Sequence, residues 1–257
     1  MTIETIGLAV ADHIATVTLQ RPPVNALNRA ARQAFIDIFD MLNDRTDVRC
    51  IVLTGSGRTF CAGADIKERA GLADEPGIQL KLNRLVRDLF LSIKECSKPV
   101  IAAVNGPAIG AGMCLALSCD ILLAADTATF AMPEIDVGIA GGIKFLAPHF
   151  SPSKTRRLLL TGQRVPAPEL YRLGVVEECV PADKLMPTAL ALAGEIAAKS
   201  PLVVGLLKES FNMVENLSFR DGYQLEQMTS VAMTRSEDSK EAKRAFIEKR
   251  KPVYKGR

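Results

Sequence analysis

Two short apolar stretches of this chain each lead into a glycine-bearing turn that is followed by a helical pattern, and this repeated arrangement constrains the fold most. The first is the expected strand 50–54 with the turn FCAGADIK at 60–67, and the second is the expected strand 100–104 with NGPAIGAGMCLALSCDI at 105–121. Glycine lets a backbone come close to another group, and the first turn of a helix offers N–H groups that no residue inside the helix uses. Two such turns that face each other would aim two N–H donors at one oxygen, which is the design of an oxyanion hole.

A carboxylate follows the second turn in the segment FAMPEIDVG at 130–138. This residue, Glu134, has Met132, Pro133 and Ile135 as its sequence neighbours, so we expect it to act in an apolar setting. Two preorganised N–H donors stabilise an oxygen on which negative charge develops, and a carboxylate base moves a proton. Together these groups indicate chemistry that passes through an enolate.

Composition argues against several other classes of function. A net charge of +3 over 257 residues is too small to indicate nucleic-acid binding, and no apolar run is long enough to cross a membrane. The two histidines, His13 and His149, are too few to indicate a metal site and argue against a hydrolase with a histidine base. The six cysteines are scattered without a CxxC pair, which favours reduced thiols and a cytoplasmic protein. A dinucleotide-binding turn written as GxGxxG from Gly110 would need glycine where Leu115 stands, so that interpretation is rejected.

The remaining patterns predict an α/β protein whose C-terminal part is helical. Asn28 is the expected N-cap of a helix whose apolar face carries Phe35, Ile38, Phe39 and Leu42. The other expected elements are a β-hairpin over 5–20, helices over 77–95, 153–161 and 167–173, strands over 121–125, 127–132 and 175–181, and only helices over 184–250. This change in pattern predicts a boundary near residue 195.

Five segments of the chain together resemble the enoyl-CoA hydratase/isomerase (crotonase) family. They are QRPPVNALN at 20–28, FCAGADIKE at 60–68, VNGPAIGAG at 104–112, PEIDVGIAGG at 133–142 and LTGQRVPAPELYRLGVVEECVP at 160–181. The resemblance implies an α/β fold with a crotonase-like ββα spiral core over residues 1–195 and a helical C-terminal oligomerisation region over residues 196–257. It also implies an acyl-CoA thioester substrate, with coenzyme A as part of the substrate and no separate cofactor, and a homotrimer or hexamer.

The resemblance assigns the two oxyanion donors to the backbone N–H groups of Ala64 and Ala111, and the catalytic acid/base to Glu134. The family usually has glycine where Ala111 stands; alanine keeps the N–H but narrows the approach to the thioester oxygen. Lys67, Lys255 and the neighbouring Tyr254 are candidates for contacts with phosphate or adenine, and a solvated surface is an equally good interpretation of these three. The substrate- and CoA-binding residues that the resemblance implies are Val24, Ala26, Ala62, Ala64, Asp65, Ile66, Lys67 and Lys255.

The chain departs from the two-glutamate hydratases of this family at one position. Those enzymes hold and activate the attacking water with two glutamates, and the first of these would fall at Cys114. A thiol there cannot share the proton of the water as a carboxylate does. Asp136 resembles an acid of the dienoyl-CoA isomerases, but their further acids would fall at Cys114 and Gly142. A single base without an acidic partner matches the Δ3,Δ2-enoyl-CoA isomerases.

We therefore expect enolate chemistry on an acyl-CoA thioester, with Glu134 taking a proton from C2 and returning it at C4. Three alternatives stay open: a weak enoyl-CoA hydratase with non-standard water positioning, a hydrolase or decarboxylase of a branched or cyclic acyl-CoA, and a non-catalytic acyl-CoA binder. Loop 68–80 and the C-terminal helices are expected to line the acyl pocket.

Overall fold

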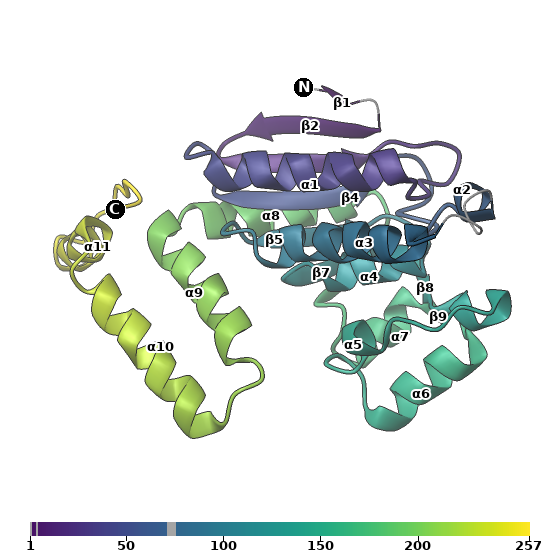
Figure 1. Ribbon diagram of the computed structural model, residues 1–257. Helices are drawn as coiled ribbons and strands as arrows, with labels where there is room; N and C mark the ends of the chain where they lie inside the picture. Colours follow the sequence, from purple (N-terminus) through teal and green to yellow (C-terminus); the bar gives the residue numbers. More distant parts are fainter. Residues whose placement is uncertain (1, 4, 71–75) are drawn as a thin grey trace.

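A mixed seven-stranded sheet forms the centre of the computed structural model, which describes residues 2–3, 5–70 and 76–257 (Figure 1). β1, β2 and β3 are antiparallel neighbours, whereas the steps from β3 through β4, β5 and β7 to β10 are all parallel. β4 and β5 are buried along their whole length, as is typical of parallel strands that are covered on both faces. In their order across the sheet, the strands are β1 (Thr2–Ile3), β2 (Ile6–Ala11), β3 (Ile14–Leu19), β4 (Cys50–Gly55), β5 (Val100–Val104), β7 (Ile121–Ala125) and β10 (Glu178–Val180).

The two glycine turns leave the same edge of this sheet, because β4 and β5 are parallel neighbours. A small second sheet then ties the second turn to the segment that carries Glu134. It consists of β6 (Ala108–Ile109), β8 (Thr129–Ala131) and β9 (Val165–Pro166). β6, which is not among the predicted strands, pairs in parallel with β8, and Glu134 follows β8 by three residues.

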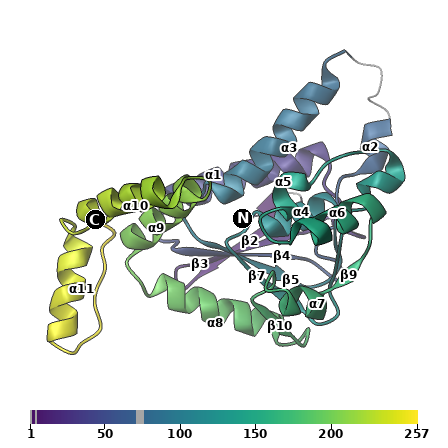
Figure 2. The ribbon, with the colours of Figure 1, turned by 90° about the horizontal axis from the view of Figure 1, so that it is seen from below.

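Helices cover both faces of the large sheet (Figure 2). α1 (Arg29–Asp44) packs against α3 (Ile78–Lys94) on one face, and α8 (Leu185–Ala197) lies across β4 and β5 on the other. The side chain of Asn28 accepts a hydrogen bond from the N–H of Ala31 at 2.9 Å, so the predicted N-cap is confirmed. The predicted apolar face of α1 is confirmed as well, since its four residues are all buried.

The other helices of the core are short and surround the glycine turns. α4 begins at the second turn, and its residues from the second onward are buried. α4 therefore presents its N-terminal end, rather than a side, to the space around the turns. These helices are α2 (Ile66–Ala70), α4 (Ala111–Leu117), the 3₁₀ helix η1 (Pro133–Val137), α5 (Ile143–Leu146), α6 (Pro152–Thr161) and α7 (Ala167–Arg172).

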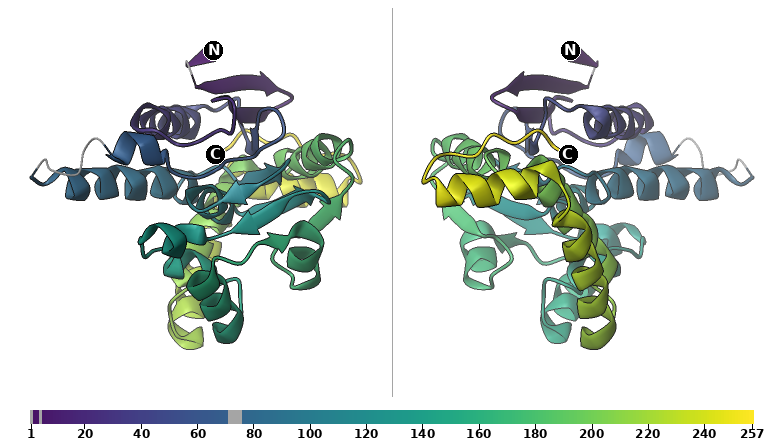
Figure 3. Two further views of the ribbon diagram at one scale, coloured as in Figure 1. Left: turned by 90° about the vertical axis from the view of Figure 1, so that its right-hand side faces the viewer. Right: turned by 90° about the vertical axis from the view of Figure 1, so that its left-hand side faces the viewer.

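Three helices follow the core and extend away from it (Figures 1 and 3). They are α9 (Pro201–Val214), α10 (Phe219–Met233) and α11 (Glu237–Ile247). Lys208 of α9 fixes this region to the core, because its buried ammonium group forms an ion pair with Asp120 at 2.8 Å and donates to two backbone carbonyl oxygens. α10 and α11 expose large apolar side chains such as Phe219 and Phe246. A homotrimer or hexamer stays a prediction.

The chain bends by 105° between α8 and α9. Ser200 lies at this bend, and its hydroxyl accepts a hydrogen bond from the N–H of Val203 at 3.3 Å, which caps α9. α8 packs on the sheet whereas α9 leaves it, but the predicted division at residue 195 itself stays a prediction. No single helix in the described part of the chain is long and apolar enough to span a membrane, and α8 and α9 pass that test only as a bent pair.

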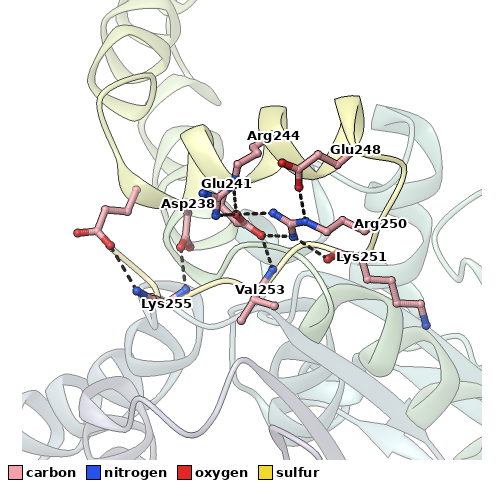
Figure 4. Close-up of polar contacts among 9 residues, drawn as sticks. Asp238, Glu241, Arg244, Glu248, Arg250, Lys251, Val253 and Lys255 are labelled. Carbon is pink, nitrogen blue, oxygen red and sulfur yellow. Dashed lines mark hydrogen bonds and ion pairs between the residues drawn. The ribbon is translucent and has the colours of Figure 1, made fainter.

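The last residues of the chain fold back along α11, where carboxylates hold them (Figure 4). Asp238 is buried and accepts hydrogen bonds from the backbone N–H groups of Lys255 and Gly256 at 2.8 and 3.1 Å. Glu241 accepts hydrogen bonds from the guanidinium of Arg250, from a second arginine and from a backbone N–H group. These hydrogen bonds hold the pKa of its carboxyl well below the usual range. The tail is therefore fixed to α11, at the far end of the molecule from α2 and α4 (Figure 1).

Candidate active site

The two glycine turns run side by side, and Ala64 and Ala111 line the same cavity. Cys61 forms a parallel bridge with Ala108. The N–H of Cys61 donates to the residue before Ala108 at 3.1 Å, and the carbonyl oxygen of Cys61 accepts from the residue after Ala108 at 2.9 Å. Ala64 and Ala111 each lie three residues beyond this bridge on their own segments. Gly63 allows this approach, because a Cβ there would lie 2.7 Å from a carbonyl oxygen of the second turn and 3.5 Å from the amide nitrogen of Ala111.

The N–H of Ala64 points away from the chain segment on its other side. Leu27 forms a parallel bridge with Ala64. The N–H of Leu27 donates to the carbonyl oxygen of Gly63 at 2.7 Å, and the carbonyl oxygen of Leu27 accepts from the N–H of Asp65 at 3.1 Å. In a parallel bridge of this kind the central residue turns its own N–H to the opposite side. Ala64 therefore directs its N–H away from Leu27, toward the side where Ala111 lies.

Ala111 is the first residue of α4, with Gly110 as the N-cap. The N–H groups of a first helical turn have no acceptor inside the helix, so the N–H of Ala111 is available to a ligand. Gly110 has φ +55°, and its N–H donates to the carbonyl oxygen of Ala131 at 2.8 Å, which anchors the turn to β8. Glycine is required at this position for its backbone conformation, and also because a side chain here would collide with Glu134.

Glu134 lies directly against this turn. A Cβ at Gly110 would overlap Oε1 of Glu134 and would lie 3.2 Å from its Cδ. The carboxylate is held there because Pro133 opens η1 immediately after β8, which is paired with β6. Ala64, Ala111 and Glu134, the three predicted catalytic residues, all line one cavity of about 600 Å³.

Cys114 lines the same cavity, one helical turn after Gly110. Burial, together with the negative charge of Glu134, raises the pKa of the Cys114 thiol above its ordinary value. The side chain at this position is therefore a neutral thiol in contact with the cavity, and it does not replace a carboxylate as a proton acceptor. Asp136 also lines the cavity, and its side chain is exposed.

Arg32 is a cavity-lining residue that was not predicted from the sequence. It belongs to α1 and is 1% exposed. Its position could have been noticed, because an arginine three residues before Phe35 falls on the apolar face of the helix. The apolar lining residues of the cavity include Val86, Phe90 and Phe145.

Comparison with known proteins identifies the family of this chain. The sequence profile of the enoyl-CoA hydratase/isomerase family matches residues 10–257. The chain belongs to this family. It is 35% identical over 263 residues to the carnitinyl-CoA dehydratase of Proteus mirabilis (strain HI4320), covering 99% of each chain. It is 34% identical over 248 residues to the 2,3-dehydroadipyl-CoA hydratase of Escherichia coli (strain K12), covering 95% of this chain and 96% of the relative.

The solved structures of the enoyl-CoA hydratase/isomerase family confirm the predicted crotonase-like α/β fold. The enoyl-CoA hydratase from Bacillus anthracis superposes with a TM-score of 0.94 at 32% identity, covering 99% of this chain and 100% of that one. Family membership makes this chain an acyl-CoA-processing enzyme. Because these relatives are named hydratase or dehydratase, the expectation of an isomerase is not confirmed by them.

Most of the residues that the family resemblance assigns to CoA binding lie together along the first glycine turn. The N–H of Ala62 donates to the carbonyl oxygen of Val24 at 3.0 Å. The guanidinium of Arg21 donates to the carbonyl oxygen of Ala26 at 3.0 Å and to Asp65 at 2.7 Å, so it joins the two segments. Ala62 and Ile66 line the cavity, whereas Val24 is exposed and Lys67 is an exposed residue of α2. Their roles toward CoA stay predictions.

Lys255 is not near this cavity within the chain. Its backbone is bound by Asp238, and its ammonium group lies 4.0 Å from Glu237. Lys255 does not line this cavity, and its contact with CoA stays a prediction. Residues 71–75 of the predicted acyl-pocket loop 68–80 lie outside the described residues.

Asp65→Asn is expected to lower the free energy of unfolding by about 1 kcal/mol near neutral pH, because it removes the charge from a half-buried ion pair. Burial opposes ionisation of Asp65, but hydrogen bonds from Arg21 and from backbone N–H groups hold its pKa below the ordinary value. Because the folded-state pKa is the lower one, this stabilisation is present above the ordinary aspartate pKa and is lost as the pH falls through the folded-state value. Urea titrations from neutral to acidic pH check this; a difference between wild type and D65N that stays constant down to acidic pH would contradict the assignment.

Proposed function

We propose that this enzyme moves a proton between C2 and C4 of a 3-enoyl-CoA ester and so converts it to the 2-enoyl-CoA. The observation that carries this proposal is the contrast between two cavity residues. The carboxylate of Glu134 lies against Gly110, beside the oxyanion donor Ala111, while Cys114 is a neutral buried thiol. A single carboxylate base is sufficient for a proton transfer, whereas activation of water in the two-glutamate hydratases uses two acids, and a thiol stands at the position of the first.

In the proposed reaction the thioester oxygen accepts hydrogen bonds from the N–H groups of Ala64 and Ala111. Glu134 takes the C2 proton, and the electrons of the broken C2–H bond form the enolate, whose negative oxygen the two donors stabilise. The thioester carbonyl then re-forms, the C1–C2 π electrons of the enolate move to form the C2–C3 double bond, and the C3–C4 π electrons take the proton from Glu134 to form the new C4–H bond. No water or cofactor is consumed, and Glu134 ends in its starting state.

Hydration of a 2-enoyl-CoA is the second candidate. The names of two relatives favour it, since these proteins, matched at 35% and 34% identity, are called a dehydratase and a hydratase. In that reaction Glu134 would activate the water, and Asp136 is the other carboxylate in the described lining that could orient it.

Product analysis with 3-hexenoyl-CoA and crotonyl-CoA separates the candidates. We expect the wild type to isomerise the first ester at least about ten times faster than it hydrates the second. Cys114→Glu is expected to raise hydration about tenfold or more, because it adds a second carboxylate beside Glu134. Cys114→Gln is the matched control: it has the same size without the charge and is expected not to raise hydration.

Hydration by the wild type at a rate comparable to isomerisation would reject the isomerase and favour the hydratase. Release of free CoA from a panel of acyl-CoA esters would instead indicate a hydrolase. Ester binding without any chemical conversion would indicate a non-catalytic binder. Each of the last two results would also contradict the proposed isomerase.

A further inference from the structure

Arg32 is the one charged side chain on the buried face of α1, a helix that the structure describes in full. Its exposure is 1%, and a guanidinium group stays charged at any pH at which the protein is folded. Burial of a charge is unfavourable compared with an apolar side chain of similar volume, so the packing of α1 does not require an arginine here. The other buried residues of the helix are Ala31, Ala34, Phe35, Ile38, Phe39 and Leu42.

The guanidinium of Arg32 is fixed close to one of the oxyanion donors. Its Nη2 donates to the carbonyl oxygen of Leu27 at 2.7 Å. Leu27 is the residue that forms the parallel bridge with Ala64. Arg32 also lines the cavity itself, and it is the only cation among the lining residues that the structure describes. Arg32 therefore brings a positive charge to the lining of this cavity, whereas Val24 and Lys67 are exposed and do not line it.

The chemistry of the cavity favours an anionic oxygen on the acyl group. Guanidinium groups bind carboxylates through short, charge-assisted hydrogen bonds and in a planar geometry. The other charged residues of the described lining, Glu134 and Asp136, are negative and would repel such a group. Among the described lining residues, a carboxylate on the acyl chain would therefore be favoured only at Arg32, and Val86 and Phe90 are apolar parts of the same lining.

We propose that the acyl group of the substrate carries a second carboxylate and that Arg32 binds it. The substrate class is then the mono-CoA thioesters of dicarboxylic acids. This inference rests on the proposed acyl-CoA function, but not on which enolate reaction follows. Arg32 acts here as a specificity-determining residue, while the proton transfer remains with Glu134.

Calorimetric binding of saturated thioesters tests the inference without turnover. The pairs are adipyl-CoA with hexanoyl-CoA and glutaryl-CoA with pentanoyl-CoA, which differ only in a terminal carboxylate or methyl group. The wild type is expected to bind the dicarboxylic ester of at least one pair about 10- to 100-fold more tightly. Arg32→Met is expected to abolish this preference, and Arg32→Lys to reduce it, because lysine keeps the charge but loses the planar fork.

Arg29→Met is the matched control, because Arg29 is an exposed arginine of the same helix that does not line the cavity. R29M is expected to keep the full preference. Equal or tighter binding of the methyl-terminated ester by the wild type in both pairs would overturn the inference, and so would a preference that persists in R32M. If R32M does not fold, R32K decides: an undiminished preference in R32K would overturn the inference. Because these measurements need no catalysis, an inactive protein would contradict the proposed isomerase without affecting this test.

Discussion

Glu134→Gln is expected to lower the rate of proton removal from C2 by about 10³-fold, within the range that general acid–base catalysis contributes. Glutamine has nearly the same shape as glutamate, so it fits the same space against Gly110. That space is narrow, since a Cβ built on Gly110 would lie 3.2 Å from Cδ of Glu134. It cannot accept the proton, however. The rate is measured as deuterium exchange at C2 of a saturated acyl-CoA and as conversion of 3-hexenoyl-CoA. Binding of the ester is expected to stay within about threefold of the wild type, because the donors on Ala64 and Ala111 are intact.

Asp136→Asn is the control for this variant, because Asp136 lines the same cavity and is carried by the same 3₁₀ helix. It is expected to lower the exchange rate by less than about tenfold. A result in which D136N loses as much activity as E134Q would indicate that the two carboxylates act together, as a hydratase requires. Retention of more than about a tenth of the wild-type rate by E134Q would show that Glu134 is not the base.

Ala111→Pro is expected to lower the same exchange rate by about 10²- to 10³-fold, the typical cost of losing one oxyanion donor. Proline removes the N–H and places its ring Cδ where the amide hydrogen points, so it also narrows the space for the thioester oxygen. Ala111 is the first residue of α4, where proline is well tolerated and where the N–H has no partner inside the helix. The residue before it is Gly110, which has no Cβ to clash with the proline ring. The variant is therefore expected to fold, with a circular dichroism spectrum and melting temperature close to those of the wild type.

Ala111→Gly is the matched control, because it changes the same side chain but keeps the N–H. It is expected to retain most of the exchange activity. Similar rates in A111P and A111G would mean that this N–H does not stabilise the enolate, and the assignment of Ala111 would then be wrong. Equal, severe losses in both variants would point to a structural requirement for alanine instead.

The sequence was sufficient to predict those parts of the molecule whose patterns are local. The apolar period of α1 and its N-cap Asn28 are both found in the structure, because an amphipathic helix and its cap are determined by residues within a few positions of each other. The same holds for β5 and for the start of α4 at the second glycine turn. The convergence of Ala64, Ala111 and Glu134 on one cavity was expected from the motifs, and all three residues line one cavity in the structure.

Features that depend on distant contacts were not accessible in this way. β6 is only two residues long and exists because it pairs with β8, about twenty residues further along the chain. Arg32 falls on the apolar face of α1, but the sequence does not show that this part of the face borders a cavity. The position of Lys255 depends on the carboxylates of α11, which hold the tail away from the cavity.

The central claim is that Glu134 and the two backbone donors catalyse proton transfer through an enolate, with no addition of water. The most direct test is to incubate the protein with 3-hexenoyl-CoA in deuterated water and to locate the deuterium in the product by NMR and mass spectrometry. We expect 2-hexenoyl-CoA with deuterium confined to C2 and C4 and without 3-hydroxyhexanoyl-CoA during the isomerisation phase. Formation of 3-hydroxyhexanoyl-CoA as fast as 2-hexenoyl-CoA, or deuterium at a carbon other than C2 and C4, would contradict the claim.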